Sequence, residues 1–464
     1  MAGLDIYAHD LVGWARRLHA GETSAVDLTE ACLARIAAHD DRLNAFTTLT
    51  ADAARIAAAE SDRRRKAGTA HGLLDGIPVA LKDNIDLAGT PATAGMASRK
   101  GVMSDSDAFV TQRLRSAGAV ILGKVNMHEA ALGATNESPL YGRTYNPHRA
   151  GFTPGGSSGG SGAAVAAGFC LAALGTDTLG SVRIPAAYCG VAGIKATRGL
   201  VSPCGVVPLS WTFDHVGPLA RSVCDLGVLL DIIAGPDPDC AESVSAPAVT
   251  GYDPGEATRL TGVRLGRLTD LNAAGVEPAV ETAFKAALDV LTGLGAEIVP
   301  VSLEGYDYGR MRRAGLIIVE AEGAIAHADD LSARPDQLSD DFRAMIAFGA
   351  GLPATKLVKA QRDIAAASLL VSRAFDGLDA LVLPTAPQTA FDFADGVPAN
   401  QADFTSIANL TDRPAVSVPM GFAPNGLPLG LQFLGRRFGE AALLRFARAY
   451  ELAADHDMRP RESF

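Results

Sequence analysis

The sequence predicts an α/β fold in which one large, mixed and mostly parallel β-sheet twists between helices that cover both of its faces. Helix-like stretches alternate with short strand-like runs along most of the chain, which is the order of elements in α/β proteins. The strand-like runs are continuously apolar rather than alternating, as in strands that are buried on both faces. No internal repeat and no clean linker interrupts the 464 residues, so we expect a single large domain.

The individual elements follow from apolar spacing, capping residues and turn residues. An amphipathic pattern over residues 5–20 stops at Gly21, and Ser24 can cap a second helix that carries one apolar stripe. The run over residues 76–81 is short and continuously apolar, which is typical of a buried strand. By the same criteria we expect further helices at residues 51–66, 107–116, 163–167 and 440–453, and strands at 119–122, 170–174, 378–383 and 415–419. Residues 236–262 are rich in Pro, Asp and Ala and indicate an excursion on the surface.

Composition limits the kind of protein that this chain can be. Hydrophobic residues make up 48% of the sequence, which is enough to form a core and too much for a disordered protein. The 52 acidic residues outnumber the 41 basic ones and give a net charge of −11, which argues against a nucleic-acid partner. No apolar stretch reaches the roughly 18 residues that a membrane helix needs. We therefore expect a monomer or homodimer with no membrane and no nucleic-acid partner.

The N-terminus and the cysteines favour the cytoplasm. The first residues include Asp5 and Asp10 and lack the basic start and apolar centre of a signal peptide. The six cysteines form no CxxC pair and no His spacing suited to zinc, so the sequence predicts no metal site. In a chain of this length they are expected to be reduced and mostly buried thiols. They are Cys32, Cys170, Cys189, Cys204, Cys224 and Cys240.

An unusual glycine- and serine-rich run occupies residues 150–162 and leads directly into a helix-forming stretch. A flexible linker is a poor interpretation, because linkers do not lie between dense apolar segments. A phosphate-binding loop would need Gly-Lys-Ser or Gly-Lys-Thr at the end of the run, where residues 161–163 are Ser-Gly-Ala. Residues 156–160 formally match the G-x-S-x-G nucleophile elbow, but that motif needs a strand directly before it, and residues 146–154 contain two prolines and a glycine. A tight turn that caps a helix is a further alternative.

Three segments indicate a function more specifically in combination than any of them does alone. They are residues 76–84, which include Lys82, the run over residues 155–161, and residues 175–185, which begin Gly-Thr-Asp-Thr-Leu-Gly-Ser and include Ser181. This combination resembles the amidase signature family, serine hydrolases that cleave C–N bonds with a Ser–cis-Ser–Lys triad. Matching motifs also lie at residues 123–127, 146–147, 189–195, 214–218, 384–387 and 426–432, so the resemblance extends from about residue 22 to residue 453.

The resemblance implies the amidase signature fold, with residues 1–464 as a single amidase domain. The domain would consist of an N-terminal helical segment, a catalytic core, a variable substrate-shaping region, and a C-terminal part of the same sheet with closing helices. The four parts would cover residues 1–70, 71–235, 236–380 and 381–464.

The resemblance also implies roles for individual residues. Lys82 stands where the family places its base, and Ser181 stands where the family places its nucleophile. The bridging serine lies 24 residues before the nucleophile in the family, which selects Ser157 and implies a cis peptide bond between Gly156 and Ser157. The oxyanion hole would consist of the backbone N–H groups of Thr178, Leu179, Gly180 and Ser181.

Residues around the triad are assigned in the same way. Ser158 would be a hydrogen-bond partner near Lys82, and Asp177 and Arg183 would support the loop that carries the nucleophile. Three positions depart from the family pattern, and none of them belongs to the triad. They are Leu179 in place of glycine or another small residue, Ala196 in place of proline, and Asp412 in place of glycine.

These residue types can perform the implied chemistry. A serine hydroxyl is a weak nucleophile at neutral pH and needs an adjacent base. Lysine can be that base when burial keeps its amine neutral, and Lys82 ends an apolar run. Ser157 can pass a proton, because a hydroxyl both donates and accepts a hydrogen bond. The plainer alternatives are an ion pair of Lys82 with Asp83 or Asp86, and a packed rather than catalytic role for His215.

We expect hydrolysis through an acyl-enzyme on Ser181, without a metal or an organic cofactor. A small-molecule amide is the default substrate, and aryl amides, carbamates (urethanes) and esters are close alternatives. A second hypothesis is the glutamine amidase subunit of a tRNA-dependent amidotransferase, which shares the three motifs and would need partner chains and a carboxylate-binding arginine. A third, from another class, is a non-catalytic binding protein on the same fold.

The substrate pocket is expected to form from variable segments, at residues 129–145, 204–213 and 300–380. Four apolar side chains near the motifs indicate an apolar, even aromatic, acyl or leaving group. They are Met127, Leu179, Trp211 and Phe213, and a place in the core is at least as good an interpretation for Phe213.

Overall fold

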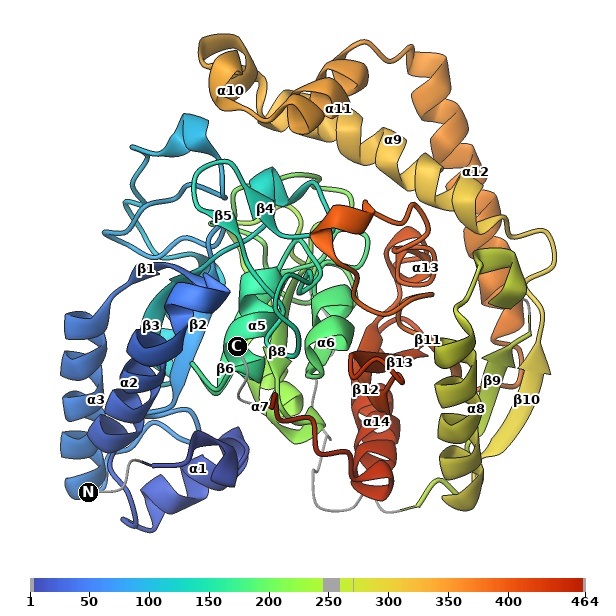
Figure 1. Ribbon diagram of the computed structural model, residues 1–464. Helices are drawn as coiled ribbons and strands as arrows, with labels where there is room; N and C mark the ends of the chain where they lie inside the picture. The colour runs from blue at the N-terminus through green and yellow to red at the C-terminus, as the bar shows by residue number, and fades with distance from the viewer. Residues whose placement is uncertain (1–3, 245–258, 270, 462–464) are drawn as a thin grey trace.

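The computed structural model describes residues 4–244, 259–269 and 271–461. An 11-stranded sheet runs through the molecule, with helices around it (Figure 1). In spatial order its strands are β1 (Phe46–Leu49), β3 (Val120–Val125), β2 (Pro78–Lys82), β6 (Ala172–Thr176), β8 (Val216–Ala220), β7 (Ala192–Lys195), β12 (Ala415–Phe422), β13 (Pro428–Leu434), β11 (Ala380–Pro384), β9 (Arg264–Leu268) and β10 (Glu297–Val301). A separate hairpin joins β4 (Glu137–Ser138) to β5 (Gly142–Arg143). The predicted α/β class with one large mixed sheet is confirmed.

Parallel pairing is less common in this sheet than the sequence predicts. Among the described strands, neighbours pair in parallel within two groups, β3-β2-β6 and β11-β9-β10. The other neighbours, from β6 through β8, β7, β12 and β13 to β11, pair antiparallel, and so do β1 and β3. The short connection between β12 and β13 illustrates the reason, because a hairpin joins antiparallel strands whereas parallel strands need a longer crossover.

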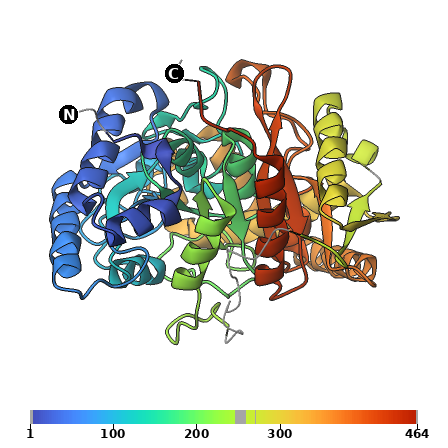
Figure 2. The ribbon, with the colours of Figure 1, turned by 90° about the horizontal axis from the view of Figure 1, so that it is seen from below.

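Helices of very different length surround the sheet. They are α1 (Leu11–His19), α2 (Ala25–Leu43), α3 (Ala51–Lys66), α4 (Phe109–Ser116), α5 (Gly159–Ala166), α6 (Arg183–Cys189), α7 (Val223–Ile233), α8 (Pro278–Gly293), α9 (Tyr308–Ala326), α10 (Ala328–Ala333), α11 (Asp340–Ala350), α12 (Ala354–Ala374), α13 (Ser406–Leu410) and α14 (Glu440–Ala454). Helices α5 and α6 pack on the middle strands, and α7, α14 and α8 form a row that contacts the same sheet (Figure 2).

Local sequence explains how the N-terminal helices begin. The single helix expected over residues 5–20 is divided into a short 3₁₀ turn, Ile6–Ala8, and α1. The division occurs because the Asp10 side chain accepts a hydrogen bond from a backbone N–H of the first turn (2.8 Å) and caps α1. Ser24 caps α2 in the same way (3.0 Å), as predicted.

Strands β2 and β6 position the residues of greatest interest. Both strands are fully buried, and they pair in parallel, with Leu81 opposite Leu174. Parallel strands end at the same edge of a sheet, so Lys82 at the end of β2 lies beside Thr176 at the end of β6. The loops that follow these strands therefore meet at this edge.

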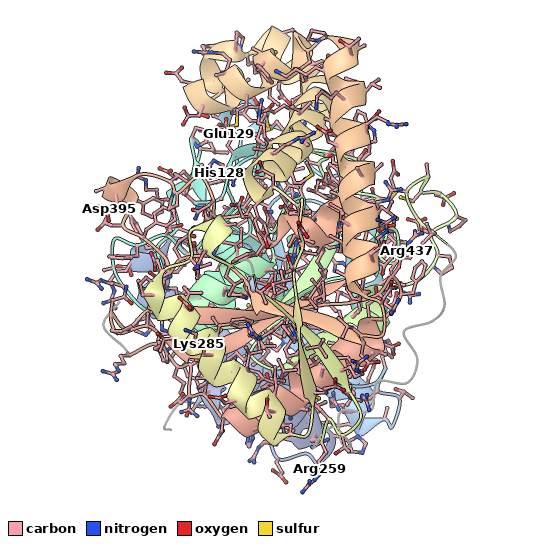
Figure 3. The ribbon with its side chains drawn as sticks, turned by 90° about the vertical axis from the view of Figure 1, so that its right-hand side faces the viewer. His128, Glu129, Arg259, Lys285, Asp395 and Arg437 are labelled. Atoms are coloured by element: carbon pink, nitrogen blue, oxygen red, sulfur yellow. The ribbon has the colours of Figure 1, made fainter. Side chains whose placement is uncertain are left out.

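Helices α9 to α12 (residues 308–374) form a helical arm that lies at the top of Figures 1 and 3. Two polar contacts tie the arm to the loops beneath it. The hydroxyl of Ser339, the N-cap of α11, donates to the carboxylate of Glu129, which Figure 3 shows under the arm together with His128. The hydroxyl of Ser98 donates to Asp330 (3.0 Å).

The predicted surface excursion is only partly visible, because residues 245–258 lie outside the described residues. In its described part, Pro238, Asp239 and Glu242 are exposed, in agreement with a surface segment, while Asp237 and Cys240 are buried and hold the segment against the body of the protein. None of the helices in the described ranges combines the length and the apolar character that a membrane crossing requires.

Candidate active site

Lys82 is fully buried and ends β2 with its amine in a small polar environment. Its Nζ donates a hydrogen bond to Ser157 Oγ (2.8 Å) and another to Thr176 Oγ1 (2.7 Å). Burial lowers the pKa of Lys82 to about 7, although the negative charges of Asp214 and Asp177 act in the opposite direction. An amine with this pKa is largely neutral above pH 7 and can accept a proton from the serine beside it.

The alternative of an ion pair between Lys82 and Asp83 does not hold. The carboxylate of Asp83 faces a different amine, Lys124, at 3.8 Å, and it accepts hydrogen bonds from Thr93 and from the N–H of Gly95. Both charged groups of this pair are buried, so the pair is part of the core. Lys82 is thereby left with hydroxyl partners rather than a carboxylate partner.

The glycine- and serine-rich run is a tight turn that opens α5. The peptide bond between Gly156 and Ser157 is cis, as the resemblance implies. Residues 153–158, which lead directly into α5, contain no strand, and this excludes the nucleophile-elbow interpretation. The first N–H groups of α5 already have acceptors, because the N–H of Gly159 donates to Asn136 (2.8 Å) and that of Gly160 to the Asn126 carbonyl (3.1 Å). A phosphate cradle would need these donors free.

Close packing explains why glycine recurs in this turn. A Cβ at Gly160 would lie 2.3 Å from the carbonyl oxygen of Asn126, and one at Gly156 would lie 2.8 Å from the backbone of Ala134. Both distances are shorter than a side chain tolerates, so only glycine lets the turn approach the neighbouring loops.

Ser181 lies on the loop between β6 and α6, next to the turn that carries Ser157. The N–H of Ser158 donates to the Ser181 carbonyl (3.2 Å), which holds the two segments together. Ser158 Oγ both donates to and accepts from the backbone of Thr176 (3.1 Å each). Ser158 therefore reaches Lys82 through Thr176, whose hydroxyl accepts from the amine.

The predicted oxyanion hole needs one correction. Within the described residues, the N–H groups of Thr178, Leu179 and Ser181 find no hydrogen-bond acceptor, which is unusual for backbone beside a cavity and suits donors kept for a ligand. The N–H of Gly180, in contrast, donates to the carboxylate of Asp177 (2.8 Å). Gly180 has a different function: it has a φ of 137°, and a Cβ there would lie 2.2 Å from the Thr405 hydroxyl.

Asp177 and Arg183 form a buried ion pair under this loop, at 2.9 Å. The Arg183 guanidinium also donates to the Thr405 carbonyl (2.8 Å), to Gln432 (2.7 Å) and to Asn409 (2.7 Å). Burial would raise the pKa of Asp177, but the charge and hydrogen bonds of Arg183 dominate and hold it below its usual value. The pair thus lies directly under the loop that carries the three free N–H groups, where the predicted supporting role of both residues remains a prediction.

Replacing Asp177 by asparagine should strongly destabilise the protein. The change leaves the Arg183 guanidinium buried without a counter-charge, which costs about 3–5 kcal/mol of unfolding free energy in comparable buried pairs. Chemical denaturation of Asp177→Asn and of the wild type measures this difference. Asp52→Asn is the matched control, because the Asp52 side chain is 98% exposed, and its effect should stay within about 0.5 kcal/mol. An equally small effect at Asp177 would contradict a supporting role.

A cavity of about 250 Å³ opens beside Ser181. Its lining is almost entirely apolar, and the helical arm covers one side of it. The lining residues are Ala131, Leu132, Gly133, Ala134, Gly156, Thr178, Leu179, Ser181, Ile184, Leu209, Arg312, Leu316, Val319, Met345, Val397, Pro398, Ala399, Gln401 and Ala402. The three variable segments expected to shape the pocket all contribute to it.

Three of the four predicted pocket side chains lie elsewhere. Met127 is fully buried in the core behind Gly95, and Phe213 is buried as well. Trp211 is 40% exposed and borders a separate depression with Asp214. Apolar character alone did not distinguish core from pocket at these positions. The fourth, Leu179, does line the cavity.

The bulky side chain of Leu179 is accommodated by α9. A Cβ on Gly315 of α9 would lie 3.2 Å from Leu179 Cδ2, so glycine at this position leaves room for the larger side chain. The side chain of Leu179 thus forms part of the cavity wall and lies against Gly315 of α9.

The prediction from sequence missed four features of the site. The hydroxyl of Thr176 accepts a hydrogen bond from the amine of Lys82, and the carboxylate of Asp214 accepts one from the Thr178 hydroxyl (2.7 Å). Arg312 of α9 reaches the cavity and pairs with Asp403. Residues 397–402 complete the lining. Thr176 was detectable, because it stands at the end of a strand-like run next to the nucleophile motif. Arg312 and residues 397–402 carry no such signal.

His215 has a packing role, as the plainer interpretation holds. Burial, reinforced by the charge of Lys195, lowers its pKa to about 3, and its Nδ1 lies 2.6 Å from the Phe213 carbonyl. Its Nε2 lies 3.2 Å from the amine of Lys195 rather than from a serine.

Comparison with known proteins places the chain in a family. The family model described as Amidase matches residues 27–444. A curated relative, a glutamyl-tRNA(Gln) amidotransferase subunit from Thermosynechococcus vestitus, is 39% identical over 96% of this chain and 98% of its own length. The solved structure of the native peptide amidase from Stenotrophomonas maltophilia is 33% identical, with a TM-score of 0.88 and 99% of each chain covered. An inhibitor-bound structure from work on an s-triazine catabolic enzyme is also 33% identical, with a TM-score of 0.91, covering 98% of this chain and 100% of the other. The chain belongs to the amidase signature family and is a hydrolase that acts on C–N bonds.

Proposed function

We propose that this protein hydrolyses small neutral amides through an acyl-enzyme on Ser181, with Lys82 as the base and Ser157 as the proton relay. The observation that carries the proposal is the buried amine of Lys82, with a pKa near 7 and a 2.8 Å hydrogen bond to Ser157 Oγ. Such an amine is a general base at neutral pH, and a serine nucleophile requires one.

The proposed reaction proceeds in two balanced halves. The Ser181 hydroxyl attacks the substrate carbonyl, its proton passes to Ser157 Oγ, and the Ser157 proton passes to the neutral amine of Lys82. The free N–H groups of Thr178, Leu179 and Ser181 donate to the oxyanion, and each such donor is worth roughly 3–4 kcal/mol in other hydrolases. The amine leaves with the proton returned through the same relay, and water then releases the acid by the reverse route.

The cavity supports an uncharged and largely apolar substrate. Leucine and alanine are the most frequent residues of the lining, and Arg312 already faces the carboxylate of Asp403. A volume of about 250 Å³ suits a small acyl or leaving group. Aryl amides and carbamates both fit this description, because the attack geometry is the same and both release an amine.

The glutamine amidase subunit of a tRNA-dependent amidotransferase is the second candidate. The curated relatives favour it, since those from Thermosynechococcus vestitus and Chloroflexus aurantiacus, 39% and 40% identical, are both glutamyl-tRNA(Gln) amidotransferase subunits. Arg312 is the guanidinium in the cavity lining, so it is the group on which the α-carboxylate of glutamine would bind. In that function the chain would work with partner chains.

A substrate panel distinguishes the two candidates. The purified chain is assayed with anilides, aliphatic amides, carbamates and glutamine, and glutamine is tested again with candidate partner chains. Turnover of a neutral amide by the chain alone, without glutamine cleavage, is the result we expect. Glutaminase activity whose KM rises in Arg312→Lys, with anilide KM unchanged, would favour the amidotransferase subunit instead, because lysine cannot replace the two-pronged contact of arginine with a carboxylate.

A further inference from the structure

A second group of reactive side chains lies outside the cavity, where the loop after β7 meets the loop after α7. Cys204 Sγ, Cys240 Sγ and a carboxylate oxygen of Asp237 all lie within 4.8 Å of one another. The carboxylate of Glu242 lies 3.5 Å from Cys240 Sγ. Two thiols and two carboxylates from distant parts of the sequence therefore meet in one place.

Local hydrogen bonds fold residues 237–243 into the turn that assembles this group. The N–H of Asp237 donates to Ser243 Oγ (2.9 Å), and the N–H of Ser243 donates to the Cys240 carbonyl (3.1 Å). From the other loop, Ser202 Oγ donates to Asp237 Oδ2 (2.6 Å) and accepts from the N–H of Cys204 (3.1 Å). Ser202 thus orients both residues, as hydrogen bonds to metal-binding carboxylates do in metalloproteins.

The two carboxylates give this group a negative charge. In the described part of the chain, the carboxylates of Asp237 and Glu242 form no ion pair with lysine or arginine, and they accept from hydroxyl, thiol and backbone donors instead. A divalent cation would balance the negative charge of the two carboxylates and would stabilise the two cysteines as thiolates.

We propose that Cys204, Asp237 and Cys240 bind one zinc ion, with Glu242 as the fourth ligand. Zinc accepts both thiolate and carboxylate ligands in a tetrahedral site, whereas calcium and magnesium take oxygen alone. With Zn–S near 2.3 Å and Zn–O near 2.0 Å, a tetrahedral site has S–O edges of about 3.5 Å. The Cys240–Glu242 distance of 3.5 Å equals this edge. The ligand atoms of Cys204, Asp237 and Cys240 lie within 4.8 Å of one another, so binding would draw them together by up to about 1.3 Å, and the Glu242 carboxylate, which lies outside that group of three, would turn toward the ion.

Solvent access and proton balance are consistent with such a site. Cys204 and Glu242 border a depression of about 300 Å³, through which a hydrated ion can enter. Binding exchanges the two thiol protons for the metal, so each zinc ion releases two protons to the buffer. The ion would join the loop after β7 to the loop after α7, independently of the hydrolysis at Ser181.

Zinc titration of the full-length protein tests the proposal. The protein is stripped with a chelator under reducing conditions and titrated with Zn²⁺ alone, with the metal content measured after dialysis. We expect one zinc ion per chain and a higher Tm with zinc present. Cys204→Ala and Cys240→Ala should weaken binding more than about 100-fold, and Ser202→Ala should weaken it about 10- to 100-fold. The matched control, Cys224→Ala, removes a thiol outside the group and should leave binding unchanged.

Cobalt substitution provides a second readout that does not depend on stability. Thiolate–cobalt charge-transfer absorption should appear in the wild type and be lost in Cys204→Ala, whose more accessible position makes it the variant least apt to disturb the fold. A folded wild-type protein that binds no zinc would overturn the proposal, and so would zinc binding unchanged in both cysteine variants. A Cys204–Cys240 disulfide in protein purified under reducing conditions would also overturn it.

Discussion

Ser181→Ala should reduce kcat/KM for any amide substrate by at least about 10³-fold, with the fold intact. The hydroxyl is the proposed nucleophile, and removal of a catalytic serine in other serine hydrolases leaves only the rate enhancement that the oxyanion hole and binding provide. Steady-state assays with the best substrate of the panel, together with circular dichroism, make the measurement. Ser181 lies at the cavity surface, so the loss of one oxygen there leaves the core unchanged.

A matched serine separates chemistry from packing. Ser161 is buried on α5 and donates to the Leu174 carbonyl (3.0 Å), outside the cavity lining, so Ser161→Ala should change kcat/KM by less than about tenfold. A fluorophosphonate probe gives an independent readout. Labelling of the wild type at Ser181, lost in Ser181→Ala, would exclude the non-catalytic binding protein. A folded protein that never labels, and a Ser181→Ala enzyme with full turnover, would each contradict the proposed mechanism.

Lys82→Met should cause a loss of similar size, because no other base lies within hydrogen-bond distance of Ser157 Oγ in the described residues. In the wild type, kcat/KM should fall tenfold per pH unit below about pH 7, where Lys82 becomes protonated, and should level off above it. A pH–rate profile with a substrate whose chemistry limits the rate measures this limb. A flat profile from pH 5 to 9 would argue against Lys82 as the base.

Stability should respond to Lys82→Met in the opposite sense to activity. The pKa of Lys82 is lower in the folded state (about 7) than the ordinary value of 10.5, so between these values the unfolded chain binds more protons than the folded one. Wild-type stability therefore falls as the pH decreases from 10.5 to about 7, and Lys82→Met removes this penalty. The free energy of unfolding of Lys82→Met, measured relative to that of the wild type, should therefore increase as the pH decreases from 10.5 to about 7, and it should stay constant below pH 7.

Lys195→Met is the matched control for the pH–rate limb. Lys195 is also fully buried, and burial lowers its pKa to about 7 as well, but its amine donates to the Ala196 carbonyl (2.9 Å) and lies beside His215. The variant should keep the acid limb of the wild type. If the acid limb of the pH–rate profile disappeared in Lys195→Met and persisted in an active Lys82→Met enzyme, the base would be Lys195 rather than Lys82.

Much of the fold could be predicted because its signals are local. Ser24 caps α2, and α3 spans the predicted 51–66, since capping residues and apolar spacing act within one or two turns. The direction of the strands was predicted less well. Strand pairing joins segments far apart in the chain, so β8, β7 and β12 could be antiparallel without any change in their own apolar character. Residues 5–20 are a local feature that the apolar pattern did not resolve, because the side chain of Asp10 caps α1 and divides the expected helix.

The pocket illustrates the limit at the scale of single side chains. Leu179 and Phe213 are both apolar and close to the motifs, yet Leu179 lines the cavity and Phe213 is buried beside His215. Arg312 reaches the cavity only because α9 crosses above the loop of Ser181, and that loop lies more than a hundred residues away in the sequence. The motif residues themselves needed no such information, because their spacing and type were enough to group them.

The sequence by itself determined the family, the α/β class and the identity of the three residues that the proposed mechanism uses. Each of these features rests on short motifs, in which particular residue types recur at fixed spacings and can be recognised without coordinates. Only the tertiary structure decided which N–H groups of residues 178–181 are free, which side chains line the cavity, and that two cysteines 36 residues apart meet two carboxylates. The physical reason is that burial and hydrogen-bond pairing depend on which distant segments come into contact, and no local pattern encodes those contacts.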